Sequence, residues 1–486
     1  MKIFVHTAIL VCMICLGAGC TQERSSEEYI KSGMVYLDKK EWNSAIIEFK
    51  NAVNQAPENA SARVALGKAY LETQNSASAI KELNKAIDLG YDKTDLSVPL
   101  GKAYLRAGES QKIIDEVVLA DTQTATDQAT INAFRGLAHL MLGDRKAASE
   151  ALEKASDRDG EATEVRLAWA VFENVNGNIE AQERWLLPLL EHEGGVAEAW
   201  SQMGELEQRK NNLDAAEKAY SRAIEIRKSP HFDSVRRAMV RISLDDIEGA
   251  ESDIDYLKKA GANWPMLAHA EGLIDFKAKN YRDAQAHFLA ALSQAPSYPP
   301  AQFMAGLSSF YQQNYQNTIS YLEQYFVSNP DNIQARLVYA TSLLAIQNSE
   351  KALEVLQDLD KKVPNNFRVL SLLSDAYLKE GKSVESLETL QRAVKAKPDQ
   401  ASTRLQLGSS LIRNPDTVGI GQQELKRALE LDPNLKQAKL ALFMSYIREK
   451  QFSQALETAK DIDNSFRDQS LGANLVALTY LAQGKS

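Results

Sequence analysis

The chain has 486 residues, of which 44% are hydrophobic and 25% are charged, with both signs interspersed. This composition excludes a disordered chain and a membrane-embedded chain, and it indicates a folded body in contact with water. The formal net charge of −9 disfavours nucleic acid and anionic lipid surfaces as partners of that body.

The first 20 residues have the pattern of a processing signal. Lys2 precedes an apolar run that ends at Leu16, and the small residues at 17–19 precede Cys20. This run is too short to be a transmembrane helix. The pattern resembles the lipobox of bacterial lipoproteins, although Leu16 stands one position further from the cysteine than the usual leucine. It predicts a signal peptide over 1–19, acylation of Cys20 with palmitate, and a short tether over 20–28.

Cysteine usage agrees with this interpretation. Cys12 and Cys15 lie in the predicted signal peptide, so the mature chain keeps only Cys20. No thiol then remains for a disulfide, a zinc site or a nucleophile. The alternative is an ordinary cleaved signal that leaves Cys20 as a free thiol.

From the tether onward, small residues recur at a fixed interval of 34 positions, with one extra residue after the third. Prolines keep the same interval at Pro296, Pro330, Pro364 and Pro398. This is the period of the tetratricopeptide repeat. The small residues are Gly33, Gly67, Gly101, Gly136, Ala170, Gly204, Ala238, Gly272, Gly306, Ala340, Ser374 and Gly408.

Each repeat is predicted to be two helices. The first carries the small residue, which allows close packing, and the second carries two alanines on either side of an aromatic or leucine side chain. The sequence therefore predicts an all-α fold, a right-handed superhelical tetratricopeptide solenoid of about thirteen helix-turn-helix repeats plus one unfinished repeat. In the first repeat the signature positions hold Tyr29, Gly33, Tyr36, Ala45, Phe49, Ala52 and Pro57.

Irregular repeats divide the predicted array. We expect an N-terminal array over 26–231, a degenerate repeat over 232–264 that is a candidate hinge, and a C-terminal array over 265–486. The repeats near Asn174 and Asp416 are also degenerate. Leu471 to Gln483 has the pattern of a first helix that no second helix follows, so we expect its apolar side chains to be exposed.

Nothing in the sequence indicates catalysis. The histidines after Cys20 are scattered along the chain with no cysteine near them, and Val196 stands where an H-E-x-x-H motif starting at His192 needs its second histidine. The Gly-Lys-Ser sequences at 381–383 and 484–486 lack the first glycine of a phosphate-binding loop. We therefore expect no enzyme activity, no metal site and no cofactor. The histidines are His139, His192, His231, His269 and His287.

Two groups of residues are candidates for partner binding. Lys68, Lys102 and Arg106 lie in register on first helices, the helices that line the concave face of such solenoids, and are expected to form a basic stripe for an acidic partner. The alternative is a solvated row of cations.

The second group is aromatic: Phe276, Phe303, Phe310 and Tyr311. Leucines hold the site of Phe310 in earlier repeats, which favours core packing. Tyr311 is less easily explained by packing, and an aromatic patch there would suit a partner helix or a sugar ring.

The segment from Glu28 to Val117 resembles the opening of the tetratricopeptide-repeat lipoproteins of exosortase (PEP-CTERM, PrsT-like) systems. The lipidated start, the short tether and the turn at 89–92 (Leu-Gly-Tyr-Asp) carry this resemblance. It implies a non-catalytic scaffold that binds proteins of an envelope export or exopolysaccharide assembly complex, with direct glycan contact as a further expectation. The implied location is the periplasmic face of the outer membrane, through the lipid anchor. Members of this family are usually longer.

Two other functions stay open. The first is an assembly lipoprotein for outer-membrane barrels or pili, which typically has fewer repeats. The second is an enzyme whose solenoid presents substrate to an unrecognised site, against which the lack of a catalytic cluster argues.

Overall fold

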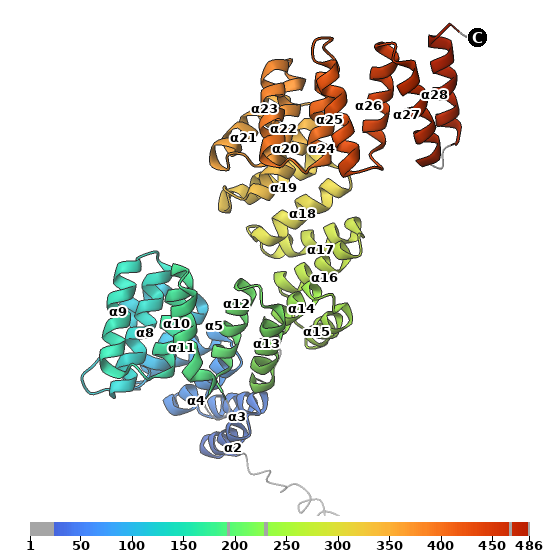
Figure 1. Ribbon diagram of the computed structural model, residues 1–486. Coiled ribbons are helices and arrows are strands. Elements are labelled where there is room, and N and C mark those ends of the chain that lie inside the picture. Colours follow the sequence, from blue (N-terminus) through green and yellow to red (C-terminus); the bar gives the residue numbers. More distant parts are fainter. Residues whose placement is uncertain (1–23, 192–194, 228–231, 466–468, 485–486) are drawn as a thin grey trace, which may run out of the picture. The chain divides into compact units, whose positions relative to one another are not determined.

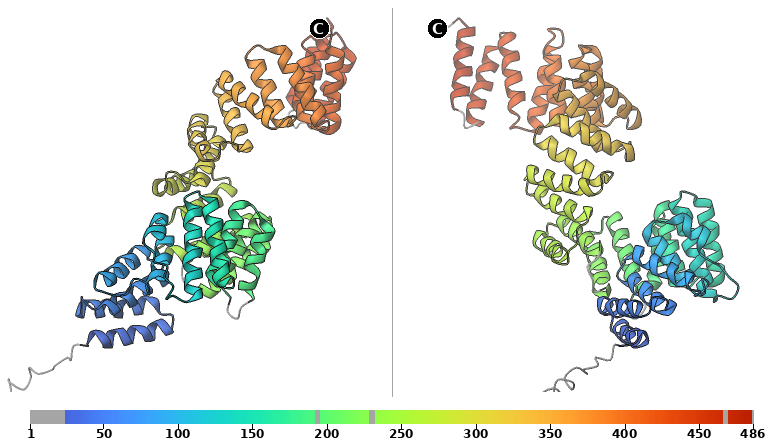
Figure 2. Two further views of the ribbon diagram at one scale, coloured as in Figure 1. Left: turned by 90° about the vertical axis from the view of Figure 1, so that its left-hand side faces the viewer. Right: turned by 180° about the vertical axis from the view of Figure 1, so that it is seen from behind.

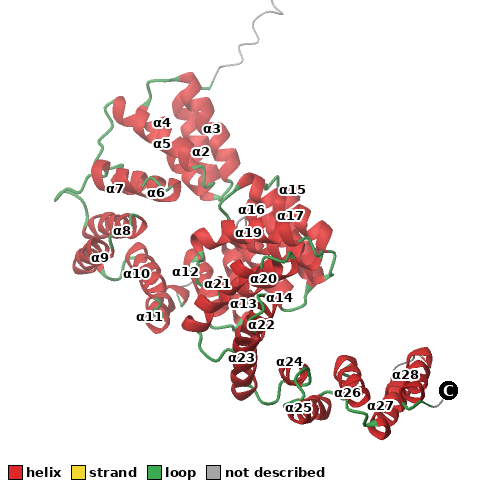
Figure 3. Ribbon diagram, turned by 90° about the horizontal axis from the view of Figure 1, so that it is seen from above, coloured by secondary structure: helices red, strands yellow, loops and turns green. Residues whose placement is uncertain are grey.

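The computed structural model describes residues 24–191, 195–227, 232–465 and 469–484 (Figure 1). Within these ranges the regular structure is helical and contains no strand, as the red helices and green loops of Figure 3 show. The chain divides into two compact units, the first ending at Leu244 and the second beginning at Asp245. The predicted signal peptide, Cys20, His192 and His231 lie outside the described residues.

The first unit consists of antiparallel helix pairs that follow one another along the chain (Figure 1). Each pair corresponds to one predicted repeat. The helices are α2 (Ser26–Asp38), α3 (Trp42–Gln55), α4 (Ala60–Glu72), α5 (Ser76–Asp88), α6 (Ser97–Ala107), α7 (Ser110–Glu116), α8 (Ala125–Met141), α9 (Arg145–Asp159), α10 (Thr163–Asn176), α11 (Ile179–Leu190), α12 (Ala197–Arg209), α13 (Leu213–Arg227) and α14 (Phe232–Ser243).

The second unit repeats this arrangement, with neighbouring pairs side by side in both views of Figure 2. Its helices are α15 (Ile247–Lys259), α16 (Pro265–Lys277), α17 (Tyr281–Gln294), α18 (Pro299–Tyr311), α19 (Tyr315–Ser328), α20 (Ile333–Ala345), α21 (Ser349–Lys362), α22 (Phe367–Lys379), α23 (Ser383–Ala396), α24 (Ala401–Leu411), α25 (Val418–Leu431), α26 (Lys436–Arg448), α27 (Phe452–Ser465) and α28 (Gln469–Ala482).

The part of the chain that the structure describes thus holds 27 helices, α2 to α14 in the first unit and α15 to α28 in the second. The predicted all-α tetratricopeptide solenoid is thereby confirmed. The boundary between the units falls between α14 and α15, inside the degenerate repeat predicted at 232–264. The role of that repeat as a hinge stays a prediction.

The recurring small residue places the two helices of a repeat close together. A Cβ atom at Gly272 of α16 would lie 2.6 Å from Cε1 of Phe288, which is fully buried on α17. Gly204 of α12 stands in the same relation to the buried ring of Tyr220 on α13. No side chain fits at such a contact, so the large ring on one helix requires the glycine on the other.

Asparagines begin many of the helices. The side chains of Asn59, Asn332 and Asn366 cap first helices, and those of Asn314 and Asn348 cap second helices. Each side-chain oxygen accepts a hydrogen bond from a backbone N–H group that has no partner inside the helix. These caps fix where each helix starts and therefore keep the repeats in register.

The third repeat departs from the regular pattern that we expected. Its second helix, α7, has only 7 residues, and Phe134 of α8 takes the place against Gly101 that a second-helix side chain takes elsewhere. The following irregular segment is held by side chains: Gln123 Nε2 donates to the carbonyl oxygen of Thr94 at 3.0 Å, and Arg135 donates to that of Val117 at 3.1 Å. The small-residue spacing alone did not reveal this exchange.

Helix α28 packs on α27, with Leu475 and Thr479 buried between them. Leu478, Tyr480 and Leu481 on the same helix are exposed, as the sequence predicted for its apolar side chains. None of the helices in the described residues has the length and apolar character needed to span a membrane.

Candidate functional site: the surface of the first helices

Arg106 bonds to the neighbouring repeat. Its guanidinium Nη1 donates to the carbonyl oxygen of Leu71, at the end of the preceding first helix, at a distance of 2.5 Å. Lys379 donates to the carbonyl oxygen of Leu344 in the same way at 2.8 Å, and Arg448 bonds to that of Ile412. A cation at this position therefore satisfies helix-end carbonyl groups that have no partner in their own helix.

Arg106 also belongs to an ion network inside the first unit. It lies 3.8 Å from a carboxylate oxygen of Glu198 on α12, three repeats further along the chain, and Arg227 of α13 donates to that oxygen at 3.2 Å. Burial lowers the pKa of Arg106. Burial also opposes the charge of Glu198, but Arg227, Lys102 and Arg106 outweigh it, and the pKa of Glu198 lies below its ordinary value.

The network continues to a fully buried carboxylate. Asp233 of α14 accepts hydrogen bonds from Ser201 Oγ at 2.5 Å and from Arg227 Nε at 3.1 Å. Arg236 lies 3.9 Å from the same carboxylate. A buried charge of this kind requires such partners.

The predicted basic stripe is therefore not uniform. Lys68 is exposed, Lys102 is half-buried, and the guanidinium of Arg106 is engaged with Leu71 and Glu198. Arg106 has a structural role that the sequence did not indicate. Binding of an acidic partner by the stripe stays a prediction.

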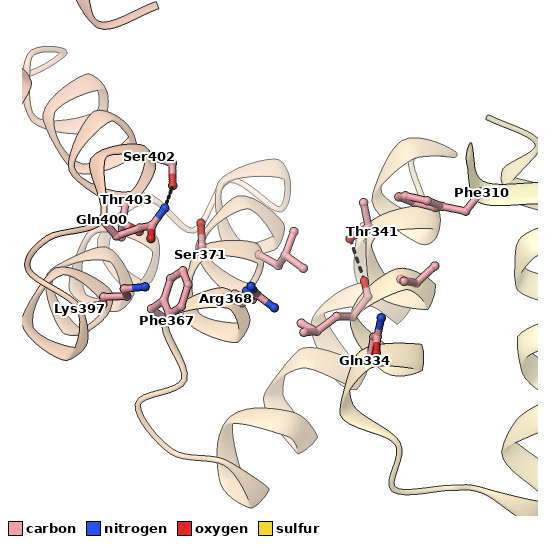
Figure 4. A pocket seen from close by; sticks show the side chains of 13 residues that line it. Phe310, Gln334, Thr341, Phe367, Arg368, Ser371, Lys397, Gln400, Ser402 and Thr403 are labelled. Carbon is pink, nitrogen blue, oxygen red and sulfur yellow. Dashed lines mark hydrogen bonds between the residues drawn. The ribbon is translucent and has the colours of Figure 1, made fainter. Parts of the chain in front are cut away.

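The second unit contains a broad hollow of about 520 Å³, lined mainly by first helices of successive repeats (Figure 4). At one end Lys397 Nζ lies 4.8 Å from the centroid of the Phe367 ring, and the guanidinium carbon of Arg368 lies 5.7 Å from it. We call this surface the basic hollow. Its lining is Phe310 of α18, Gln334, Leu337, Val338 and Thr341 of α20, Phe367, Arg368, Ser371 and Leu372 of α22, Lys397, Gln400, and Ser402 and Thr403 of α24.

The lining of the basic hollow contains two cations and no carboxylate. Within the described residues, neither Arg368 nor Lys397 has a carboxylate partner within ion-pair distance, and no cluster that could hold a metal ion is found there. The amide and hydroxyl groups can pair with a peptide backbone, and Leu337, Val338 and Leu372 can contact apolar side chains. The hollow suits an extended peptide with an acidic group.

The aromatic candidates separate into two places. Phe276 and Phe310 contact the ring of Tyr311, with centroid distances of 5.7 Å and 5.8 Å. Phe303 instead packs on Tyr325 at 5.3 Å, within the core around α19 and α20. Core packing, the alternative to a binding role, thus holds for Phe303.

Two further tyrosines join the group at Tyr311. The ring of Tyr281 stacks on that of Tyr311, with centroids 4.7 Å apart, and Tyr315 contacts Phe310 at 5.9 Å. Sequence reasoning missed both. Their signal was available, because Tyr281 and Tyr315 are 34 residues apart and each begins a second helix.

Comparisons with known proteins agree with this architecture. Family profiles described as tetratricopeptide repeat match residues 36–96, 197–230, 269–333 and 309–375. None of the curated proteins matches the sequence.

Among solved structures, the chain is similar to one described as the APC/C hetero-tetramer Cut9-Hcn1, with a TM-score of 0.53, 13% identity, and coverage of 96% of this chain and 98% of that one. It also matches yeast Tom70 (TM-score 0.36, 14% identity, 95% and 96% covered). A tetratricopeptide repeat protein from Parabacteroides merdae matches as well (TM-score 0.36, 15% identity, 51% and 98% covered). The chain therefore contains tetratricopeptide repeats, and they build the helical solenoid described above.

Proposed function

We propose that the protein is a non-catalytic scaffold that binds an extended acidic segment of a partner protein in the basic hollow. The observation that carries this proposal is the pair of cations Arg368 and Lys397, which face the ring of Phe367 in a lining without carboxylates. In a protein of net charge −9, such a place attracts an acidic ligand. Tetratricopeptide repeats commonly bind other proteins, which supports this class of function.

The experiment uses fluorescein-labelled peptides in which aspartate alternates with leucine or valine, and measures their binding by fluorescence anisotropy at low and high salt. We expect salt-dependent binding that weakens at least about tenfold when Arg368 and Lys397 are both changed to glutamate. Lys395→Glu is the matched control, because Lys395 is exposed on α23 outside the hollow. The proposal is overturned if the double variant, the Lys395→Glu control and the parent protein bind the peptides with equal affinity.

We further propose that this scaffold works at the bacterial envelope. It would be a lipoprotein anchored through Cys20 at the periplasmic face of the outer membrane, with partners in exopolysaccharide export linked to PEP-CTERM protein sorting. The lipobox-like start and the resemblance over Glu28 to Val117 support this. The alternative of an assembly lipoprotein for outer-membrane barrels or pili makes a different prediction, since neighbouring genes would then encode barrel or pilus components.

Membrane attachment can be tested directly. The Cys20→Ser variant should leave the membrane fraction after a high-salt wash, because acyl chains supply the affinity that an acidic body lacks. Retention of this variant with the membranes would contradict the lipoprotein assignment.

The basic stripe is a second candidate for an acidic partner. Since Arg106 bonds to Leu71 and Glu198, the useful variants are Lys68→Glu and Lys102→Glu. If the stripe binds acidic peptides, the double variant should bind the same peptides more weakly. Unchanged affinity would show that these two lysines only contact solvent.

A further inference from the structure

One part of the second unit carries no formal charge over an unusual length. Residues 284–322 contain no aspartate, glutamate, lysine or arginine, in a chain of which 25% is charged. The segment covers most of α17, all of α18 and the first half of α19. The flanking charges are Arg282 and Asp283 before it and Glu323 after it.

Core packing does not explain why residues 284–322 lack charged side chains. Other repeats bury the same kinds of side chain and still place charges on their exposed positions, as Lys379, Glu380 and Lys382 do in the turn after α22. The equivalent turn after α18 is exposed but holds Gln312, Gln313 and Asn314. The turns after α4 and α20 are also uncharged, but only after α18 does the uncharged stretch continue over a whole repeat. Charged side chains normally keep such surfaces soluble, so their replacement by amides over a whole repeat points to a ligand that is itself uncharged.

Aromatic rings lie at this same turn. Tyr311 is 52% exposed, the largest exposed fraction among the aromatic side chains of the described residues. Its ring stacks on Tyr281 with an interplanar angle of 13°, and the edge of Phe276 holds both rings at centroid distances of 5.3 Å and 5.7 Å. The rings therefore form a fixed platform that presents Tyr311 to solvent.

Amide groups fix and surround the platform. Gln312 Nε2 donates to the carbonyl oxygen of Tyr281 at 3.1 Å and to Gln285 Oε1 at 2.9 Å, which ties the turn to α17. Gln316 and Asn317 are exposed in the first turn of α19, beside Tyr315. We call Tyr281, Tyr311 and Tyr315 with Gln313, Gln316 and Asn317 the neutral patch.

We infer that the neutral patch binds a neutral carbohydrate. A flat, exposed tyrosine ring stacks on the apolar C–H face of a sugar ring, and each amide can both donate to and accept from hydroxyl groups. No full charge is needed, and five of the six patch residues lie in the uncharged segment 284–322, while Tyr281 stands next to Arg282 just before it. An uncharged proline-rich peptide also stacks on tyrosine, but it offers few hydroxyl partners for the amides, so the carbohydrate fits the composition better.

The inference does not rest on the proposed peptide site. The basic hollow selects acidic groups, whereas the neutral patch selects uncharged ones, and only Phe310 contacts both. Variants at Tyr311 and at Lys397 should therefore separate the two activities.

The test uses the whole chain on an array of neutral glucose, galactose and mannose oligosaccharides, together with uronate oligosaccharides and an uncharged proline-rich peptide. Affinity for the best neutral oligosaccharide is then measured by titration calorimetry. We expect Tyr311→Ala to weaken it at least about tenfold and Tyr311→Phe to retain most of it, because the ring face supplies the contact. Gln316→Glu should weaken it less.

Tyr256→Ala is the matched control, since Tyr256 is 46% exposed on α15 and lies outside the patch. Far-UV circular dichroism and thermal unfolding of Tyr311→Ala show that the variant is folded, independently of any peptide binding. The inference is overturned if no neutral oligosaccharide binds, if only uronates or the proline-rich peptide bind, or if Tyr256→Ala weakens binding as much as Tyr311→Ala.

Discussion

Both units hold basic residues on a first helix, Arg106 and Arg368, and at the end of a second helix, Arg227 and Lys397, but these residues have different partners. In the first unit Arg106 and Arg227 are bonded to Glu198, and Arg227 is also bonded to the buried Asp233. In the second unit Arg368 and Lys397 face the ring of Phe367 in a lining without carboxylates. The comparison teaches that a cation near a first helix stays available for a partner only where no carboxylate of the same unit reaches it.

The largest effect should come from the buried carboxylate of the first unit. Asp233→Ala would remove the buried acceptor of Arg227 Nε and Ser201 Oγ and leave Arg227 paired with Glu198 alone. We expect the first unit to lose about 3 to 5 kcal/mol of unfolding free energy. Urea unfolding followed by tryptophan emission reports this, because Trp42, Trp169, Trp185 and Trp200 all lie in that unit. Asp283→Ala, at an exposed site of the second unit, is the control. A loss below about 1 kcal/mol would mean that the network is not needed for stability.

The second unit should instead be sensitive to acid, through His269. This side chain is 3% exposed, its Nδ1 has no hydrogen-bond partner, and burial lowers its pKa to about 4. The unfolded chain takes up a proton near pH 6.5, so stability is complete above that pH and falls as the pH drops towards 4. We expect a loss of about 2 to 3 kcal/mol at pH 4.5 relative to pH 8.

His269→Phe should lack this part of the pH dependence. Unfolding of the parent and the variant at both pH values isolates the histidine, since all other groups titrate in both proteins. An identical pH dependence in the two proteins would contradict the assignment.

A smaller effect should come from a kind of contact that occurs within each unit separately. Arg106→Met and Lys379→Met each remove a bond to a helix-end carbonyl, at Leu71 and Leu344. We expect each to cost about 1 kcal/mol, with a larger loss for Arg106 because it also pairs with Glu198. Local hydrogen exchange at the ends of α4 and α20 measures the two losses separately. Equal losses would show that the ion pair with Glu198 contributes nothing.

The smallest effect should be the same in both units. Gln74 and Gln347 adopt the left-handed conformation, with φ of 60° and 63°, in the turn after a first helix. Glycine adopts this conformation without steric cost, so Gln74→Gly and Gln347→Gly should each stabilise the chain by about 0.5 kcal/mol. Thermal unfolding would detect this stabilisation. A destabilisation would show that the glutamine side chains make contacts worth more than the steric cost of the left-handed backbone.

The helix pairs could be predicted from the sequence because they depend on local periodicity. Gly272 must face Phe288, since the two positions keep a fixed spacing within one repeat, and the same reasoning applied to the other regular repeats. Gly101 is an exception to this spacing, because the side chain that contacts it, Phe134, comes from the next repeat. When a side chain from the next repeat takes the place of one from the same repeat, the spacing of the small residues does not change. The spacing could therefore not reveal that Phe134 contacts Gly101.

The candidate sites were harder to predict because they depend on side chains far apart in the sequence. Arg106 and Glu198 meet only when the third and sixth repeats are stacked, and no pattern within one repeat indicates that contact. The basic hollow likewise combines residues from four successive first helices. Tyr311 was identified from the sequence because core packing explained it less easily than Phe310, whereas its stacking on Tyr281 required the positions of two neighbouring repeats.

The uncharged segment also determines which methods can detect a partner there. Amine-reactive and carboxyl-reactive cross-linkers have no side chain to modify between Asp283 and Glu323. Trypsin, which cleaves after lysine and arginine, has no site between Arg282 and Arg336, so the face around Tyr311 falls in one long peptide that standard proteomics recovers poorly. A partner bound at this face would escape routine interaction mapping, and photo-cross-linking from positions 313 or 316, with chymotryptic digestion at the tyrosines, would be needed to capture it.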